Sequence, residues 1–128
     1  MKQIIHTDNA PHAIGAYSQA VKSADTLYVS GQIPMHPRTM TLIEGDFKKQ
    51  ATQAFANLSA IIEAAGATLN DTLKLTIYLT DLNHFDVTNE VMSTFFSKPF
   101  PARACIEVKA LPKGAHIEID AIVNLTEK

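Results

Sequence analysis

The sequence has one cysteine, no long apolar run and no excess of charge of either sign, and each shortage excludes a class of protein. A single cysteine excludes an intrachain disulfide framework, which fits a reducing compartment. No apolar run approaches the ~20 residues of a membrane-spanning helix. The first fifteen residues also lack the apolar core of a secretory signal. We therefore expect a cytoplasmic protein with no membrane partner.

The charge balance argues against nucleic acid as a partner. Eleven basic residues oppose thirteen acidic ones, the formal net charge is −2, and no basic run is present. The hydrophobic fraction of 46% is ordinary for a soluble globular protein. At 128 residues, the chain is expected to form one domain (1–128) that buries roughly two-thirds of its unfolded surface.

Several motifs of common chemistries are absent. The sequence contains no glycine-rich dinucleotide or phosphate loop and no GxSxG elbow. Its five histidines never occur at HxH or HxxxH spacing. With one cysteine, a zinc site would need an unusual assembly of distant residues. We therefore expect surface histidines, no metal and no cofactor.

Hydrophobic periodicity predicts two helices and a strand between them. Apolar residues recur at helical spacing over 45–66, with an aspartate at the start and Gly66 after the last turn. The stretch TLKLTIYLTDL then alternates, which predicts a strand whose buried face carries Leu73, Leu75, Ile77 and Leu79. A second helix is expected over 83–96, ended by Pro99 and Pro101.

The remaining segments predict further strands. Residues 16–24 and 26–34 read as two strands joined by a polar turn. Residues 103–109 and 116–125 flank a loop with Pro and Gly, which predicts a hairpin or a near neighbour of one. The order indicates an α+β fold, with a mixed sheet of about six strands backed by two helices.

Such a sheet has one face that the helices leave uncovered. We expect that face to carry a mixture of charged and apolar side chains: Arg103, Cys105, Glu107, His116, Glu118, Asp120, Tyr28 and Ile122. This mixture suits packing around a symmetry axis, with polar clefts between subunits, so we expect a homo-oligomer. A monomer with one hydrated sheet face is the alternative.

The stretch PFPARACIEV places a guanidinium, Arg103, on the same strand face as the sole thiol, Cys105. Arg103 has two interpretations: an ion pair with Glu107, Glu118 or Asp120, or a planar grip on a substrate carboxylate. Glu118, expected one strand away, would orient a water or relay a proton, or would simply be solvated.

Cys105 has three interpretations. It is a small thiol packed in a strand, a residue that contacts the ligand without covalent chemistry, or a nucleophile activated by Arg103 and by His116 across the hairpin.

The sequence resembles the RidA (YjgF) branch of the reactive intermediate deaminases. The resemblance rests on ordered blocks along nearly the whole chain: NAPHAIGAYSQAV, VSGQIP, IIEAAG, DLNHFDVTNEV, FPARACIEV and LPKGAHIEIDAI. It implies a chorismate-mutase-like fold assembled as a homotrimer with sites between subunits. It also implies hydrolysis of 2-enamines and 2-imines, such as 2-aminoacrylate and 2-aminocrotonate, to 2-keto acids and ammonia, without a cofactor.

The resemblance also implies residue roles. Arg103 would hold the substrate carboxylate, Glu118 would handle water and protons, and the Tyr17 hydroxyl would point into the cleft. Gly31 would let the backbone approach the ligand, and Asn89 and Cys105 would line or adjoin the pocket. The same cleft would also suit a non-catalytic sensor of 2-keto acids. RNA cleavage or translation inhibition, an older family label, is disfavoured by the acidic charge.

Four features depart from the family pattern. Ala16 precedes Tyr17 where relatives usually have proline, and the segment between Phe96 and Phe100 is shorter than in many members. Residues 35–45 differ from the usual Asn-Pro-x-Thr-Gly pattern, and IEID replaces IEIE, which leaves Glu118 intact. The principal polar groups remain, so these departures bear on cleft shape and substrate preference.

Overall fold

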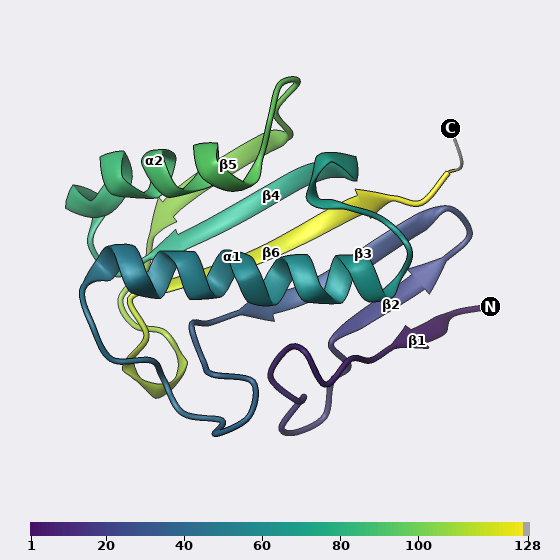
Figure 1. Cartoon of the computed structure of the whole chain (residues 1–128), viewed down its shortest axis with the longest axis horizontal. Helices are drawn as coiled ribbons and strands as arrows, with labels where there is room; N and C mark the ends of the chain where they lie inside the picture. The colour runs from purple at the N-terminus through teal and green to yellow at the C-terminus, as the bar shows by residue number, and fades with distance from the viewer. Residues whose placement is uncertain (127–128) are drawn as a thin grey trace.

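The computed structural model describes residues 1–126 as a six-stranded sheet with two α-helices on one side (Figure 1). The strands are β1 (Gln3–Ile5), β2 (Ala20–Ser23), β3 (Thr26–Gln32), β4 (Thr72–Leu79), β5 (Ala102–Glu107) and β6 (Ile117–Asn124). The helices are α1 (Phe47–Ala64) and α2 (Phe85–Phe95), with short 3-10 turns at Leu69–Asp71, Leu82–His84 and Pro112–Gly114. The α+β class with six strands and two helices is confirmed.

Both ends of α1 are set by local chemistry. The Asp46 side chain accepts a hydrogen bond from the Lys49 backbone N–H at 3.0 Å, so it caps the first turn. Gly66 follows the last turn at φ +89, a left-handed conformation that glycine adopts without a steric penalty. The apolar stripe of α1 is buried, and Phe55, Leu58, Ile61 and Ile62 are fully enclosed in the core.

The sheet has the order β1-β2-β3-β6-β4-β5, and only β4 and β5 run parallel. A parallel pair needs a crossover, and α2 provides it between β4 and β5. Of the two alternatives predicted for the last two strands, the hairpin is therefore wrong: β5 and β6 are not paired, because β4 lies between them. The pattern gave no indication of β1, and the predicted strand 16–24 is shorter, since residues 16–19 lie in a loop.

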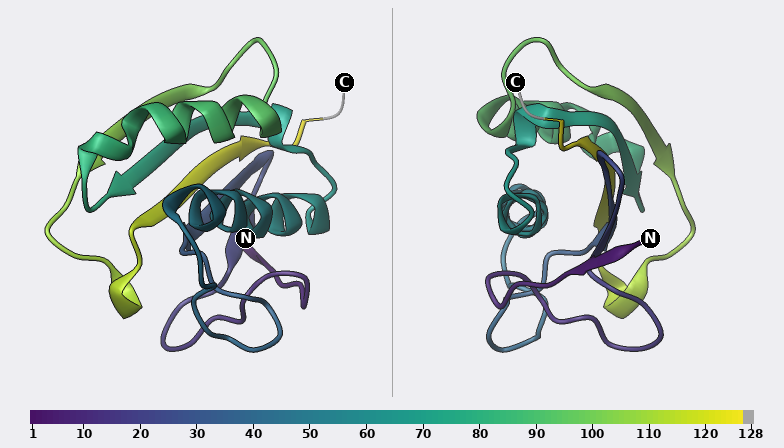
Figure 2. Two further views of the ribbon diagram at one scale, coloured as in Figure 1. Left: turned by 60° about the vertical axis from the view of Figure 1, so that its left-hand side comes forward. Right: turned by 90° about the vertical axis from the view of Figure 1, so that its right-hand side faces the viewer.

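The core lies between the helices and one face of the sheet. Figure 2 shows α1 end-on, with the curved sheet on one side of it. Within residues 1–126, no α-helix covers the opposite face, which we call the open face. Tyr28, Ile122, Glu118 and Asp120 occupy the open face, as predicted, because they alternate with buried residues of β3 and β6.

Three of the side chains predicted for the open face lie on the helix side instead. Arg103, Cys105 and Glu107 pair with Leu75, Ile77 and Leu79, whose side chains are buried toward the helices. Paired residues of adjacent strands share a face, so β5 presents its polar residues at the helix-side edge of the sheet. The composition of the uncovered face was therefore predicted only in part.

The predicted alternation along β4 fails at its first position. Leu75, Ile77 and Leu79 are fully buried, whereas Leu73 is 53% exposed. A register irregularity between Thr72 and Lys74 in the pairing with β6 turns Leu73 out of the alternation.

Leu75 and Leu73 give a matched test of the packing. Leu75→Ala should lower the free energy of unfolding by about 2–5 kcal/mol, because it leaves a cavity in the core. Leu73→Ala should change it by no more than about 0.5 kcal/mol. Urea unfolding of both variants measures the difference, and equal losses would contradict the placement of Leu73.

Candidate functional site

Two separate cavities are lined by all the predicted site residues except Cys105. The larger, of about 540 Å³, is lined by Tyr17, Gly31 and Glu118 together with neighbouring loop residues. The smaller, of about 340 Å³, is lined by Asn89 and Arg103 with Met92, Ser93, Phe100 and Pro101. We call them the Glu118 cavity and the Arg103 cavity. The predicted site residues are thus brought together as two groups, not one.

The Glu118 carboxylate lies directly against the backbone of Gly31. A Cβ added at Gly31 would lie 2.5 Å from Glu118 Oε2, closer than real Cβ contacts allow. Gly31 also lies within a register irregularity of the β3–β6 pairing, between Val29 and Gln32. Because Gly31 has no side chain, it leaves room for the Glu118 carboxylate. The sequence had led us to expect a different role, in which Gly31 lets the backbone approach the ligand.

Glu118 is half-buried, and burial raises the pKa of its carboxyl group, with the nearby negative charge of Asp120 adding to the effect. Asp120 itself accepts a hydrogen bond from the Tyr78 hydroxyl at 2.9 Å. A carboxyl group with a raised pKa exchanges protons closer to neutral pH than an exposed one does. Glu118 is therefore electrostatically suited to proton transfer.

Tyr17 reaches the same cavity from the loop between β1 and β2. Its side chain is 52% exposed, and its hydroxyl accepts a hydrogen bond from the Ile14 backbone N–H at 3.3 Å. This contact fixes the phenol at the wall of the cavity. The hydroxyl proton remains available to donate to a ligand.

Neutral groups of α2 hold the Arg103 guanidinium. Its Nη1 donates to Asn89 Oδ1 and lies 3.6 Å from Met92 Sδ, and its central carbon lies 5.3 Å from the centre of the Phe85 ring. Among residues 1–126, no carboxylate forms an ion pair with Arg103. The guanidinium is thus positioned but not neutralised, so it can bind an anion.

Sequence reasoning missed Phe85 and Met92 as supports of Arg103. The signal was present, because positions 85, 89 and 92 recur at helical spacing and so share one face of α2. On that face, Met92 is buried in the core, whereas Phe85 is 38% exposed.

The predicted acid partners of Arg103 are engaged elsewhere or face away from it. Glu107 accepts a hydrogen bond from the Leu82 backbone N–H at 2.9 Å, and Asp120 binds Tyr78. Glu118 pairs with Tyr78 and lies on the open face, two strands from Arg103. The expected distance of one strand is therefore wrong, because β4 intervenes.

Cys105 belongs to the lining of neither cavity and is partly buried against the core. Burial raises the pKa of its thiol, and the positive charge of Arg103 only partly opposes this. His116 lies beyond β4, where its Nδ1 is 3.2 Å from Thr80 Oγ1. The observations favour a packed thiol over an activated nucleophile.

Comparison with known proteins decides the family. The model of the family described as endoribonuclease L-PSP matches residues 7–125. The chain belongs to the RidA/YjgF/RutC family. A RidA from an Antarctic Psychrobacter superposes with a TM-score of 0.92 at 54% identity, covering 95% of this chain and 98% of that one.

Two further relatives of the RidA family bear on function. The Rattus norvegicus protein named 2-iminobutanoate/2-iminopropanoate deaminase is 48% identical over 122 residues, which cover 95% of this chain and 89% of the rat protein. The structure of E. coli TdcF with bound serine has a TM-score of 0.91 at 39% identity and covers 97% and 99% of the two chains. No helix in the described part of this chain combines the length and apolar character needed to span a membrane.

The environment of Glu118 predicts its titration. In an NMR titration, its carboxyl carbon should show a midpoint above the ordinary glutamate value of about 4.3. Asp120→Asn keeps an acceptor for Tyr78 and should lower the Glu118 midpoint without restoring the ordinary value, because burial is the larger cause. A midpoint at or below the ordinary value in the parent protein would contradict this description.

The raised pKa of Glu118 also determines how its contribution to the free energy of unfolding depends on pH. A carboxyl group with a raised pKa in the folded state contributes stability below its unfolded pKa and loses it as the pH rises through the folded pKa. Glu118→Gln should therefore raise the free energy of unfolding more at about pH 7 than at about pH 3.

Proposed function

We propose that this protein hydrolyses 2-enamine and 2-imine carboxylates to 2-keto acids and ammonia, at sites formed between the subunits of a homotrimer. The observation that carries the proposal is the Arg103 guanidinium, which opens into a cavity and is held by neutral groups alone. A planar cation in this state binds a carboxylate through two parallel hydrogen bonds. The deaminase name of relatives such as the rat protein supports the reaction.

The division into two cavities supports a site shared between chains. Arg103 lies on the helix side at the edge strand, and Glu118 lies on the open face. One small substrate cannot contact both side chains of a single chain, because the sheet separates them. Arg103 of one subunit and Glu118, Tyr17 and Gly31 of the next would complete the site, and a closed ring of chains repeats this site at every subunit boundary.

The chemistry follows from the groups present. Arg103 holds the carboxylate, with Asn89 fixing the guanidinium, so that the C=N carbon stands at the Glu118 cavity. The imine reacts as its protonated iminium form. Ionised Glu118 takes a proton from water as the water oxygen adds to the C=N carbon, which gives a neutral carbinolamine. Glu118 donates that proton to the amino nitrogen, and the C–N bond breaks to release ammonia. Glu118 takes the hydroxyl proton as the carbonyl forms, and transfer of this proton to ammonia gives ammonium and restores ionised Glu118. Tyr17 donates a hydrogen bond to the developing polar group.

The imine carbon is already electrophilic, so a positioned acid–base group is sufficient for this reaction. Such a group supplies roughly 10²–10⁴-fold in rate, and holding the substrate adds positioning. Cys105 has no bonding role in this scheme and lies outside both cavities. The serine bound in the TdcF structure carries the same carboxylate that Arg103 would hold here.

The carboxylate grip is tested with purified protein and a dehydratase that releases the imine, with semicarbazide trapping what remains. Arg103→Ala should lower kcat/KM by roughly 30-fold or more, because a charged hydrogen-bonded contact worth about 2–5 kcal/mol is lost. Arg103→Lys keeps the charge but not the planar pair of donors, so it should restore little. Arg38, the other arginine, is exposed and outside both cavities, and Arg38→Ala is the matched control.

Binding measurements separate the enzyme from a sensor. If the parent protein binds 2-ketobutyrate but leaves the decay of the imine unchanged, the deaminase proposal is wrong and the sensor interpretation stands.

The shared site is tested by mixing two inactive variants. Arg103→Ala and Glu118→Gln, unfolded together and reassembled at equal ratio, should regain about one quarter of the parent activity, because each site draws one residue from each of two chains. As a control, Arg103→Ala mixed with the double variant should regain nothing. Mixed oligomers seen by native mass spectrometry without any recovered activity would contradict a site shared between chains.

A further inference from the structure

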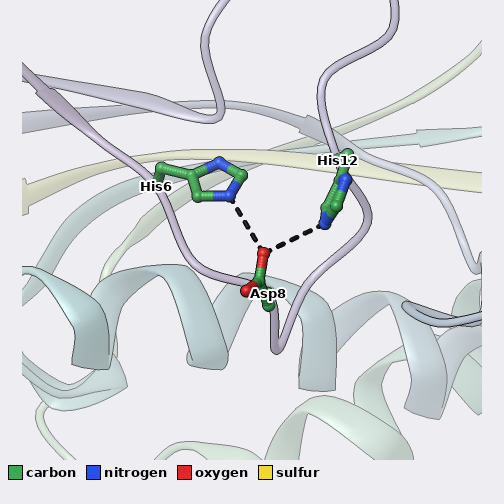
Figure 3. A group of neighbouring side chains, drawn as sticks. All are labelled: His6, Asp8 and His12. Carbon is green, nitrogen blue, oxygen red and sulfur yellow. Dashed lines mark hydrogen bonds and ion pairs between the residues drawn. The ribbon is translucent and has the colours of Figure 1, made fainter.

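A cluster of metal-ligating side chains lies in the loop that follows β1. Figure 3 shows His6 and His12 on opposite limbs of this loop, with both rings directed at Asp8. Each imidazole Nε2 lies 3.1 Å from the same oxygen, Asp8 Oδ1, and all three residues are exposed. The spacing His-x-Asp-x₃-His matches neither the HxH nor the HxxxH pattern considered in the sequence. The fold of the loop brings these side chains together.

We propose that His6, Asp8 and His12 bind a divalent transition-metal ion of the Zn²⁺ class. Two imidazole nitrogens and one carboxylate oxygen form a donor set that borderline ions such as Zn²⁺, Ni²⁺ and Co²⁺ favour. The set disfavours Mg²⁺ and Ca²⁺, which take oxygen ligands. Three protein ligands leave at least one coordination position for water.

The distances fit a chelate. Ligand atoms ~2.0–2.2 Å from one ion lie about 3.0–3.5 Å from each other at octahedral or tetrahedral angles. Both nitrogen–oxygen separations, at 3.1 Å, already lie in that range, and the three ligand atoms all lie within 4.8 Å of one another. The third separation, between the two nitrogens, is therefore at most 4.8 Å. Both rings are exposed, and their centroids lie 5.3 Å apart.

A buried side chain holds the loop in the shape that this site requires. Gln19, only 2% exposed, accepts a hydrogen bond from the Thr7 N–H at 2.8 Å. Its amide nitrogen donates to the carbonyls of Thr7 at 3.0 Å, Pro11 at 2.8 Å and Ala10 at 3.4 Å. The backbone between the ligands is thus fixed before an ion arrives. Preorganisation of this kind distinguishes a built site from side chains that meet by chance.

The position of the site gives it a defined neighbourhood. His12 lines the Glu118 cavity, and Tyr17 follows in the same loop. A bound ion would tie His6, at the end of β1, to the rim of that cavity. The proposal does not depend on the deaminase reaction, because no ligand of the ion takes part in that chemistry.

Calorimetric titration of the untagged full-length protein with ZnCl₂ tests the site. One ion per chain should bind, and His6→Gln, Asp8→Asn and His12→Gln should each lower the affinity by about 100-fold or more. This expectation follows because even residues that only support a metal ligand contribute about 10–100-fold. His36 is exposed and lies outside the cluster, so His36→Gln should bind as the parent does.

Imidazole ¹⁵N spectra identify the ligands independently of affinity. Zn²⁺ should shift the Nε2 resonances of His6 and His12 and leave those of His36, His84 and His116 in place. The proposal is overturned if no saturable binding occurs, or if binding survives the His6→Gln/His12→Gln double substitution. It is equally overturned if Asp8→Asn has no effect. The ligands are exposed, so circular dichroism of the variants should match the parent.

Discussion

The insertion of β4 between β5 and β6 is the constraint on which the rest of the molecule depends. Side chains alternate along a strand, so the register of β4 with each neighbour decides which face receives each polar group. Arg103 pairs with Leu75 and faces α2, whereas Glu118 pairs with Tyr78 and faces away from the helices. A shift of one residue in either register would reverse these assignments. The two halves of the proposed chemistry are therefore separated by the same sheet that supports them both.

The surroundings of Arg103 and of Glu118 suit these residues to their proposed roles in different ways. Arg103 is kept available because its neighbours, Asn89, Met92 and Phe85, are neutral, so its charge is not cancelled within the chain. Glu118 is prepared by partial removal from water, together with a like charge at Asp120, and both effects favour its protonated form. In the proposed reaction, a cation without an ion-pair partner and a carboxyl group with a raised pKa act together where two chains meet. Oligomerisation would then be a requirement of the chemistry, separate from any gain in stability.

The sequence predicted local features well and long-range pairing poorly. Helical periodicity located α1 and α2 to within about two residues, because the signal lies within each segment. Arg103 and Glu118 were singled out by strand alternation, and the family blocks added Tyr17, Gly31 and Asn89. The β5–β6 pairing was wrong because adjacency along the chain says nothing about a strand inserted from earlier in the sequence. The cluster at His6, Asp8 and His12 was missed because a loop obeys no simple period, and its shape depends on the distant side chain of Gln19.

The contact between Gly31 and Glu118 has a consequence for how this cleft can diversify. The carboxylate occupies the volume that any side chain at position 31 would need, so the two positions share a single small space. A larger residue at one is compatible only with a shorter or redirected residue at the other. Engineering the pocket for bulkier ligands therefore has to begin elsewhere, at other residues of the cavity lining such as Ile14 or Ile33.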